Sequence, residues 1–487
     1  SQTALRYQDF TNLMAYDYHG TWNDVVGPNA PLYDDGKDGE LSDLYNTPEY
    51  QKVGYFNTDW AFHYLRGALQ AGRINIGIPY YTRGWKNVSG GQNGLWGTSG
   101  ATDCQPGTGT KRPCGGGASG IDNIWHDQTG NGGELSAGIS PMWHAKNLEK
   151  NILPAYADHV GLTPATNPDH RLSGTYVREW DPITRTSWLW NETKKTFLST
   201  EDEGGVDAIV DYVKASGAGG VMMWELSGDY QCPPDARPES PCVMGYTLTT
   251  RLSEQLAGSA PYGELRSQGS SAQLPPTALD VKVELAKYPS DAAHLWPLTP
   301  VVRITNNTDV TLGGGKNTTL SFDLPTSTSS LIKDGNWQTG EQAGQWRITP
   351  GHTGPNAGVG LRGNFHRITT TLEYCQIIPP RGSLELPIIY YLPATGPVNA
   401  LLDLGGHAFS TAGEQLRGAG LVTPPAGGCS AAEWNVTKIY DPATQPIEET
   451  TIRYQGKVWR AKWWTLGNIP GSGADADHEA WKLIGPG

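Results

Sequence analysis

The feature that most constrains the fold is a pattern in the first half of the chain, where short apolar segments alternate with segments of helical period. Residues 10–16, 74–79 and 220–225 are predicted to be strands, and the first of them is expected to be buried. Residues 60–69 and 205–215 are predicted to be helices. Because apolar strands that alternate with helices form parallel βα units, we expect an α/β fold.

Two breaks in composition divide the chain. Residues 258–276 and 421–432 are rich in turn-forming and small residues and are predicted to be linkers. In the first part, residues 1–257, too many residues separate the second and third strands for a single helix, so an α+β insertion is expected at about 86–197.

The two downstream parts have strand-like patterns. Residues 277–420 are predicted to form an all-β sandwich, because alternating segments separated by turn residues recur at 279–285, 300–307, 318–324, 366–374 and 384–392. Residues 433–487 are too few to bury all of their tryptophans, so some of the rings are expected to face solvent: Trp434, Trp459, Trp463, Trp464 and Trp481.

Charge and cysteine usage restrict the partners and the compartment. The formal net charge of -13 disfavours nucleic acid, and no apolar run reaches the roughly 18 residues of a membrane span. An even number of cysteines in turn-rich segments favours disulfides and an oxidising compartment, with free thiols as the alternative. We expect neither a metal site nor a cofactor, since no CxxC pair is present. The candidate pairs are Cys104 with Cys114, Cys232 with Cys242, and Cys375 with Cys429.

Three predicted strand ends carry aromatic and hydrogen-bonding residues. These are MAYDYHG at 14–20, GIPYYTRGW at 77–85 and MWE at 223–225. In α/β barrels, functional groups lie at the C-terminal ends of the strands. Aromatic rings with convergent polar groups suit a carbohydrate, whose apolar faces stack on rings while its hydroxyls form hydrogen bonds.

These segments resemble motifs of glycoside hydrolase family 18. MAYDYHG is similar to MxYDxxG on the sixth barrel strand, and GIPYYTRGW is similar to GxPxYGRxW on the seventh, with Thr82 where Gly is usual. GVMMWELSGDY is similar to the eighth strand. The resemblance covers about residues 5–256 and implies the C-terminal part of a (β/α)8 TIM barrel from a bacterial chitinase.

The resemblance also implies roles for individual residues. Tyr16 and Asp17 would act in catalysis at the N-acetyl group of the sugar in the −1 subsite. The expected substrate-binding residues are Met14, Tyr81, Arg83, Trp224 and Glu225, with Trp224 as the floor of the subsite and Glu225 either bonding a sugar or holding Arg83. Core packing of Tyr16 and Trp224, and an ion pair between Arg83 and Glu225, are the structural alternatives.

The family's catalytic acid is the last residue of DxxDxDxE on strand four, and the chain contains no such string. Residues 35–40 (DGKDGE) resemble part of it, but we predict a solvated loop there. The acidic run 201–203 is predicted to begin a helix or to edge the insertion. Strands one to five are therefore expected to be missing, the sequence to be part of a longer protein, and this chain alone to be close to inactive.

The C-terminal part has a resemblance of its own. AKWWTLGNIPG at 461–471 and WKLIG at 481–485 are similar to the small chitin-binding modules of bacterial chitinases. This implies an exposed ring at Trp463 or Trp464, with Trp464 favoured, and a core role for Trp459 and Trp481. The middle domain resembles the sandwich of some bacterial chitinases, where three tryptophans could contact chitin or fill the core: Trp296, Trp337 and Trp346.

The sequence therefore predicts a secreted chitinase that acts on chitin and N-acetylglucosamine oligomers and is a monomer when full length. The alternatives are a chitin-binding protein without hydrolysis, and an adhesin or scaffold module. The second is disfavoured because scaffolding does not need the residues of the −1 subsite together.

Overall fold

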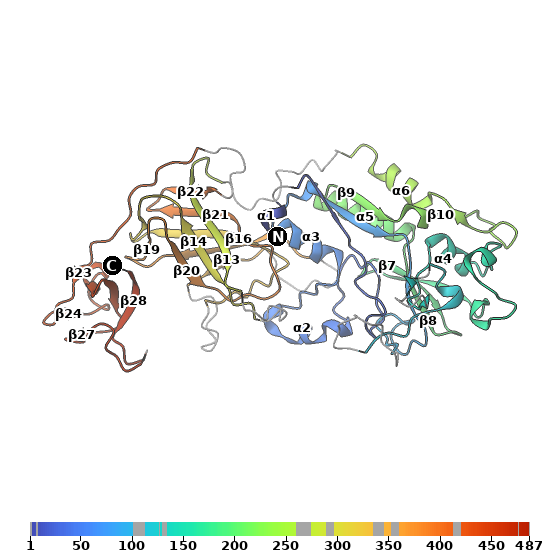
Figure 1. Cartoon of the computed structure of the whole chain (residues 1–487), viewed down its shortest axis with the longest axis horizontal. Coiled ribbons are helices and arrows are strands. Elements are labelled where there is room, and N and C mark those ends of the chain that lie inside the picture. The colour runs from blue at the N-terminus through green and yellow to red at the C-terminus, as the bar shows by residue number, and fades with distance from the viewer. Residues whose placement is uncertain are drawn as a thin grey trace. The chain divides into compact units, whose positions relative to one another are not determined.

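A computed structural model describes most of the chain (Figure 1). It divides into two compact units, Ser1–Gly269 with Thr353–Gly363, and Ser270–His352 with Asn364–Gly487. The residues outside the description are 1, 6–7, 101–112, 126, 129–133, 260–273, 289–296, 335–344, 352–359, 413–419, 476 and 487. Most of the first predicted linker therefore lies outside the described residues. The same holds for three residues singled out in the sequence, Cys104, Trp296 and Trp337.

The first unit is built on a three-stranded parallel sheet in the order β1–β2–β9. Its strands are β1 (Thr11–Leu13), β2 (Ile74–Pro79) and β9 (Gly220–Trp224). The predicted parallel α/β arrangement is confirmed. The prediction of a buried strand at 10–16 is wrong, because β1 has only three residues and lies at the sheet edge, where Phe10 is 47% and Met14 68% exposed.

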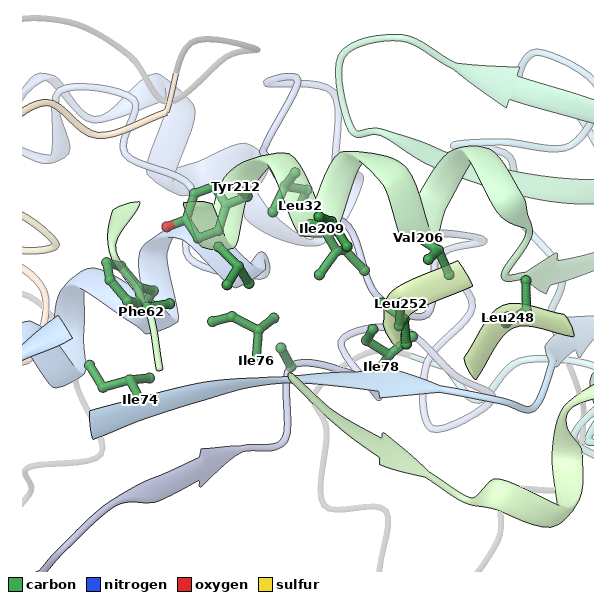
Figure 2. Packing of buried hydrophobic residues seen from close by; sticks show 14 of the residues in the cluster. Leu32, Phe62, Ile74, Ile76, Ile78, Val206, Ile209, Tyr212, Leu248 and Leu252 are labelled. Carbon is green, nitrogen blue, oxygen red and sulfur yellow. The ribbon is translucent and has the colours of Figure 1, made fainter. Parts of the chain in front are cut away.

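The central strand β2 carries the core of this unit. Because side chains alternate between the two faces of a strand, Ile74, Ile76 and Ile78 all lie on the face that packs against α5 (Glu203–Ser216), as Figure 2 shows. Helix α5 begins at Asp202, whose side chain accepts from the Gly205 amide. The predicted helix start at 201–203 is thereby confirmed. The other helices of the unit are α1 (Gln2–Leu5), α2 (Ser42–Asn46), α3 (Thr58–Arg66), α4 (Met142–Glu149) and α6 (Thr247–Leu256).

The stretch between β2 and β9 holds an antiparallel sheet in the order β3–β8–β7–β6. Its strands are β3 (Arg83–Trp85), β6 (Tyr176–Asp181), β7 (Thr186–Asn191) and β8 (Thr196–Thr200), and two short strands, β4 (Asp127–Gln128) and β5 (Glu134–Leu135), pair nearby. With α4 between β5 and β6, this stretch has the α+β character that its length predicts.

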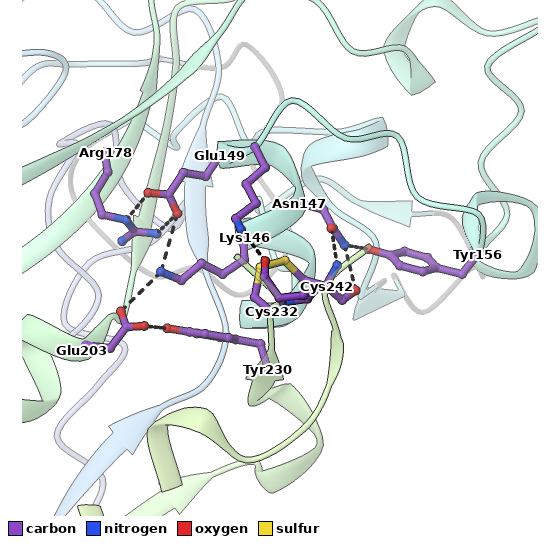
Figure 3. Close-up of a disulfide and its surroundings, with 11 residues drawn as sticks. Lys146, Asn147, Glu149, Tyr156, Arg178, Glu203, Tyr230, Cys232 and Cys242 are labelled. Atoms are coloured by element: carbon purple, nitrogen blue, oxygen red, sulfur yellow. Dashed lines mark hydrogen bonds and ion pairs between the residues drawn. A yellow bond between two sulfur atoms is a disulfide. The ribbon is translucent and has the colours of Figure 1, made fainter. Parts of the chain in front are cut away.

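Hydrogen bonds and an ion pair tie helix α4 of this insertion to the disulfide-closed hairpin that follows β9 and to α5 (Figure 3). Cys232 and Cys242 are bonded and close the hairpin of β10 (Tyr230–Gln231) and β11 (Val243–Met244). Asn147 of α4 accepts from the Cys242 amide, and Lys146 of α4 pairs with Glu203. Helix α4 is thereby fixed to both the hairpin and α5.

The second unit contains the predicted sandwich. A six-stranded sheet in the order β12–β22–β21–β16–β18–β17 and a three-stranded sheet in the order β13–β14–β20 share one apolar core, in which Trp346 is buried. The larger sheet is formed by β12 (Ala278–Leu279), β16 (Thr318–Pro325), β17 (Arg347–Thr349), β18 (Phe365–Thr371), β21 (Val398–Leu404) and β22 (Ala408–Thr411). The smaller is formed by β13 (Val281–Ala286), β14 (Val301–Asn306) and β20 (Ser383–Pro387), and β15 (Leu312–Gly313) pairs with β19 (Ile377–Ile378).

The C-terminal module belongs to the same compact unit as the sandwich. Its strands are β23 (Ala432–Glu433), β24 (Ile439–Tyr440), β25 (Thr451–Tyr454), β26 (Lys457–Ala461), β27 (Thr465–Leu466) and β28 (Trp481–Pro486), with α7 (Ile447–Thr450) before β25. The connection predicted at 421–432 is hydrogen-bonded along the sandwich, with the Gly427 amide donating to the Thr311 carbonyl at 2.7 Å. The Cys375–Cys429 disulfide fixes the same segment.

Candidate functional site

The three predicted strand ends meet at one edge of the parallel sheet. The register pairs Leu13 of β1 with Ile76 of β2, and Pro79 of β2 with Trp224 of β9. The residues that follow each strand therefore emerge side by side, since parallel strands end at a common edge. This edge brings together the side chains of Tyr16, Asp17, Tyr81 and Arg83, and Trp224 ends the neighbouring strand.

The carboxylate of Asp17 is the centre of the site. Its Oδ1 accepts a hydrogen bond from the Tyr81 hydroxyl at 2.7 Å and another from Arg83 Nε at 2.8 Å. The Asp17 backbone has a φ of 60°, a left-handed conformation that aspartate tolerates better than most residues. That conformation is held by Asn29, whose Oδ1 accepts from the Asp17 amide at 2.8 Å.

Two tyrosines border this carboxylate and both keep their protons. Burial, followed by the negative charge of Asp17, raises the pKa of Tyr81 far above its usual range. The same two causes, in the same order, raise the pKa of Tyr16. The rings of Tyr16 and Tyr81 contact edge to face with centroids 6.0 Å apart. Each hydroxyl is therefore a hydrogen-bond donor at neutral pH.

Exposed apolar surface flanks the polar centre. Trp224 is 57% exposed at the end of β9, so this ring is not packed into the core of this chain. Met14 is also exposed. A ring that the sequence analysis missed, Trp22, lies with its centroid 5.3 Å from the Arg83 guanidinium. The only sequence signal for Trp22 was its position five residues after Asp17.

Glu225 lies beside this edge, directly after β9. The Ser227 hydroxyl donates to the Glu225 carboxylate, whereas Arg83 is paired with Asp17. Arg83, for which Glu225 was one of the expected partners, thus binds the carboxylate of the first strand end. Its side chain is only 14% exposed, so it holds Asp17 from the protein side and leaves the other face of the carboxylate accessible.

The segment 35–40 is not the solvated loop that we predicted. Asp35 and Asp38 are buried, at 8% and 2% exposure. Asp38 accepts from His19 Nε2 at 3.0 Å, and Asp35 accepts from the Trp96 indole at 2.9 Å. Burial of acidic groups requires such partners, and both partners lie far away in sequence.

His19 anchors that segment beneath the site. Its Nδ1 donates to the Pro28 carbonyl at 2.9 Å. Burial lowers the pKa of His19, but Asp38, the Pro28 carbonyl and Glu40 outweigh burial and raise it. In the described part of the chain, His19, Asp38 and Glu40 form a group whose possible metal-ligand atoms lie within 4.8 Å of one another. Within this group, His19 and Asp38 are hydrogen-bonded to each other.

The C-terminal module presents a second candidate surface. Trp463 and Trp464 follow β26 and are 44% and 55% exposed, so both rings face solvent. Leu466 and Ile439, which are paired between β27 and β24, extend the apolar surface and are also exposed. Trp481 is buried against Tyr440, which agrees with its predicted core role, and Trp459 is partly buried in the same cluster.

Comparisons with known proteins find similarities to the two larger parts of the chain. Residues 1–229 match the model of the glycosyl hydrolases family 18, and residues 242–427 match the model described as Chitinase C. The chain is 28% identical over 223 residues to Chitinase A1 of Niallia circulans, covering 45% of this chain and 24% of that protein. It is 30% identical over 234 residues to Chitinase ChiA of Flavobacterium johnsoniae, covering 46% and 13%.

A solved structure is similar across both units. A family GH18 chitinase from Chromobacterium violaceum has 42% sequence identity and a TM-score of 0.73, with 85% of this chain and 59% of that chain covered. This chain thus spans less than two thirds of each of these relatives. None of the described helices is long and apolar enough to cross a membrane.

Proposed function

We propose that this chain is part of a family 18 chitinase and contains half of its substrate-binding cleft. The observation that carries the proposal is the convergence of Tyr81 and Arg83 on the Asp17 carboxylate, with Tyr16 and the exposed Trp224 ring at the same sheet edge. Ring surface beside a fixed carboxylate and two protonated hydroxyls suits an N-acetylated sugar, which offers both an apolar face and an amide.

The chemistry proposed is retaining hydrolysis of β-1,4-linked N-acetylglucosamine polymers. The acetamide oxygen of the substrate attacks the anomeric carbon while the glycosidic oxygen leaves with a proton, and water then opens the cyclic oxazolinium ion. The Tyr16 hydroxyl would donate to the acetamide oxygen and orient it. Asp17 would accept from the acetamide N–H through its accessible face, so its charge would stabilise the cation as it forms.

The proton for the leaving oxygen must come from outside this chain. The sequence contains no DxxDxDxE string. Three strands cannot close a barrel of eight, and the outer strands β1 and β9 leave apolar side chains partly exposed along the open sheet. We therefore propose that five further strands complete the barrel in the natural protein and that this chain alone is close to inactive.

The C-terminal module would hold the enzyme on its substrate. Two adjacent exposed tryptophans, Trp463 and Trp464, offer the flat apolar surface that the face of a chitin chain can stack on. The sandwich, whose Trp346 is part of the core, would act as a spacer. The disulfides Cys232–Cys242 and Cys375–Cys429 among the described residues are consistent with a secreted protein. We propose that the full-length protein is a monomer and needs no cofactor.

The second candidate is a chitin-binding protein without hydrolytic activity. The absence of the acid-bearing string from the sequence favours it, and the exposed rings of the module would serve that function equally well. An adhesin that does not bind chitin is disfavoured, because it would not need Tyr16, Asp17 and Tyr81 together.

The intact mass of the natural protein, measured together with hydrolysis of a fluorogenic N-acetylglucosamine oligomer, distinguishes the candidates. We expect a mass well above the 52.6 kDa of this chain, with turnover by the natural protein and oligomer binding without turnover by the 487 residues alone. A natural protein of about 52.6 kDa that binds chitin without turnover would establish the second candidate. A protein that binds no chitin would refute both.

A further inference from the structure

Asn29 connects all the elements that hold the Asp17 centre, although no motif marks it. Its side chain accepts from the Asp17 amide at 2.8 Å, and its backbone carbonyl accepts from the Tyr18 amide at 3.1 Å. Its own amide donates to Ser199 Oγ at 2.8 Å. Ser199 lies on β8, directly opposite Arg83 of β3. One residue thus links the end of β1 to the insertion sheet that carries Arg83.

The amide nitrogen of the Asn29 side chain has an unusual environment. Asn29 is 2% exposed, and its buried Nδ2 makes no hydrogen bond of standard geometry to any of the described residues. A buried donor without a partner is costly, so such groups are uncommon where function does not require them. The Asn29 side chain faces the Tyr81 hydroxyl closely enough to oppose the rise in the pKa of Tyr81 that burial and Asp17 cause.

The two ends of this amide therefore act on different members of the site. Oδ1 fixes the backbone of Asp17 in its left-handed conformation, which points the carboxylate at Tyr81 and Arg83. Because the Asn29 side chain opposes the rise in the pKa of Tyr81 as a hydrogen-bond partner, Nδ2 is the group that can donate to the Tyr81 hydroxyl when that hydroxyl turns away from Asp17. A substrate amide that competes for the Asp17 carboxylate would produce that situation.

We propose that Asn29 is a positioning residue that holds Asp17 through Oδ1 and supports Tyr81 through Nδ2, so that the insertion sheet sets the geometry of the sugar-binding edge. The expected effect of Asn29 on sugar binding rests on the proposed function. Its structural part, the hold on Asp17, stands on the contacts alone.

Two variants separate the two ends of the amide. Asn29→Ala removes both, whereas Asn29→Asp keeps an acceptor for the Asp17 amide and loses the donor that faces Tyr81. Asn147→Ala is the matched control, because Asn147 is equally buried and hydrogen-bonded, to Tyr156 and Cys242, but contacts none of the site residues. All three are made in the 487-residue chain.

Two readouts are measured, the hydrogen-exchange rate of the Asp17 amide and the affinity for an N-acetylglucosamine tetramer by calorimetry. Asn29→Ala should speed exchange at Asp17 and weaken tetramer binding, each by about tenfold, as expected for the loss of one hydrogen bond. Asn29→Asp should leave exchange at Asp17 within about threefold of wild type but still weaken binding about tenfold. Asn147→Ala should change neither.

The outcomes that overturn the proposal are distinct. Wild-type exchange at Asp17 in Asn29→Ala would refute the hold through Oδ1. Wild-type affinity in Asn29→Asp would refute the role of Nδ2. Equal losses in Asn147→Ala would show that general destabilisation is responsible. If the wild-type chain binds no tetramer, the proposed function fails instead, and exchange at Asp17 still decides whether Asn29 holds the aspartate.

Discussion

Replacing Asp34 by asparagine should stabilise the protein strongly at alkaline pH and by a much smaller amount at acidic pH. Asp34 is 6% exposed. The Tyr45 hydroxyl donates to Oδ1, but Oδ2 is buried without a partner. Burial raises the pKa of Asp34 to about 7, with repulsion from Asp35 and Asp38 adding to it and the Tyr45 hydrogen bond opposing it.

The sign and size follow from linkage. The folded state holds the Asp34 proton up to about pH 7, while the unfolded state releases it near the ordinary value of 3.8. Between these values the folded state binds more protons, so stability falls as pH rises through that window and the full loss is present above it. About three pKa units at 1.36 kcal/mol each give a ceiling of about 4 kcal/mol, which structural relaxation reduces to about 2–4 kcal/mol.

The assay is the free energy of unfolding of the first unit in urea at pH 4.5 and pH 8.0. Asp34→Asn should exceed wild type by about 2–4 kcal/mol at pH 8.0 and by only about 1 kcal/mol at pH 4.5, because the unfolded state has already released most of the Asp34 proton there. Asp43→Asn removes the same charge at an exposed position of the same segment and should change the free energy of unfolding by less than about 0.5 kcal/mol at both pH values. An Asp34→Asn effect that is equal at both pH values, or is matched by Asp43→Asn, would refute the reasoning.

Three further predictions concern other parts of the chain. Trp463→Ala and Trp464→Ala should each weaken adsorption to crystalline chitin about tenfold without unfolding the module, since both rings are exposed, and unchanged isotherms for the double variant would exclude them as the binding surface. Glu373→Gln should lower the stability of the module by about 1–3 kcal/mol in calorimetry, because Glu373 of the sandwich pairs with Arg460 at 2.8 Å and Lys482 at 2.6 Å. An unchanged stability would mean that the disulfide and the apolar contacts alone hold the module on the sandwich. Gly117→Ala should destabilise the insertion by more than about 3 kcal/mol in urea, because its Cβ would lie 1.6 Å from the Ser136 carbonyl oxygen, whereas Gly100→Ala, with no atom within 4 Å, should stay within about 0.5 kcal/mol.

Periodicity identified the elements that are stabilised by local pattern. Strand β2 begins and ends where its apolar run predicts, and α5 follows from its helical spacing and the acidic run at its start. Strand β1 did not follow from its pattern. An apolar run such as residues 10–16 is fully buried only in a strand that is covered on both faces and paired along both edges. Strand β1 is an edge strand, paired only with β2.

The candidate site was predictable where short motifs carry it. Asp17, Tyr81 and Arg83 come from two motifs about 65 residues apart, and parallel pairing of β1 with β2 brings them together. The partner of Arg83 was not predictable, because Asp17 and Glu225 both emerge at the same edge and only the direction of the side chains separates them.

Burial of the acidic segment was not predictable either. Six residues rich in Asp, Gly and Lys have the composition of a solvated loop. Two of them, Asp35 and Asp38, are nevertheless buried, because Trp96 and His19, which lie 61 and 19 residues away, supply hydrogen-bond donors. Asn29 was missed for a similar reason, since its importance lies in contacts with β8 that are 170 residues distant.

The central claim is that the edge formed by β1, β2 and β9 binds an N-acetylated sugar, and calorimetric titration of the 487-residue chain with an N-acetylglucosamine tetramer tests it most directly. Wild type and Trp224→Ala are compared in the background of Trp463→Ala and Trp464→Ala, so that the module cannot contribute. The account predicts measurable binding that Trp224→Ala weakens by at least about tenfold, the loss of about 1.4 kcal/mol expected for one stacking ring. Absence of binding in this background, or binding that Trp224→Ala leaves unchanged, would contradict it.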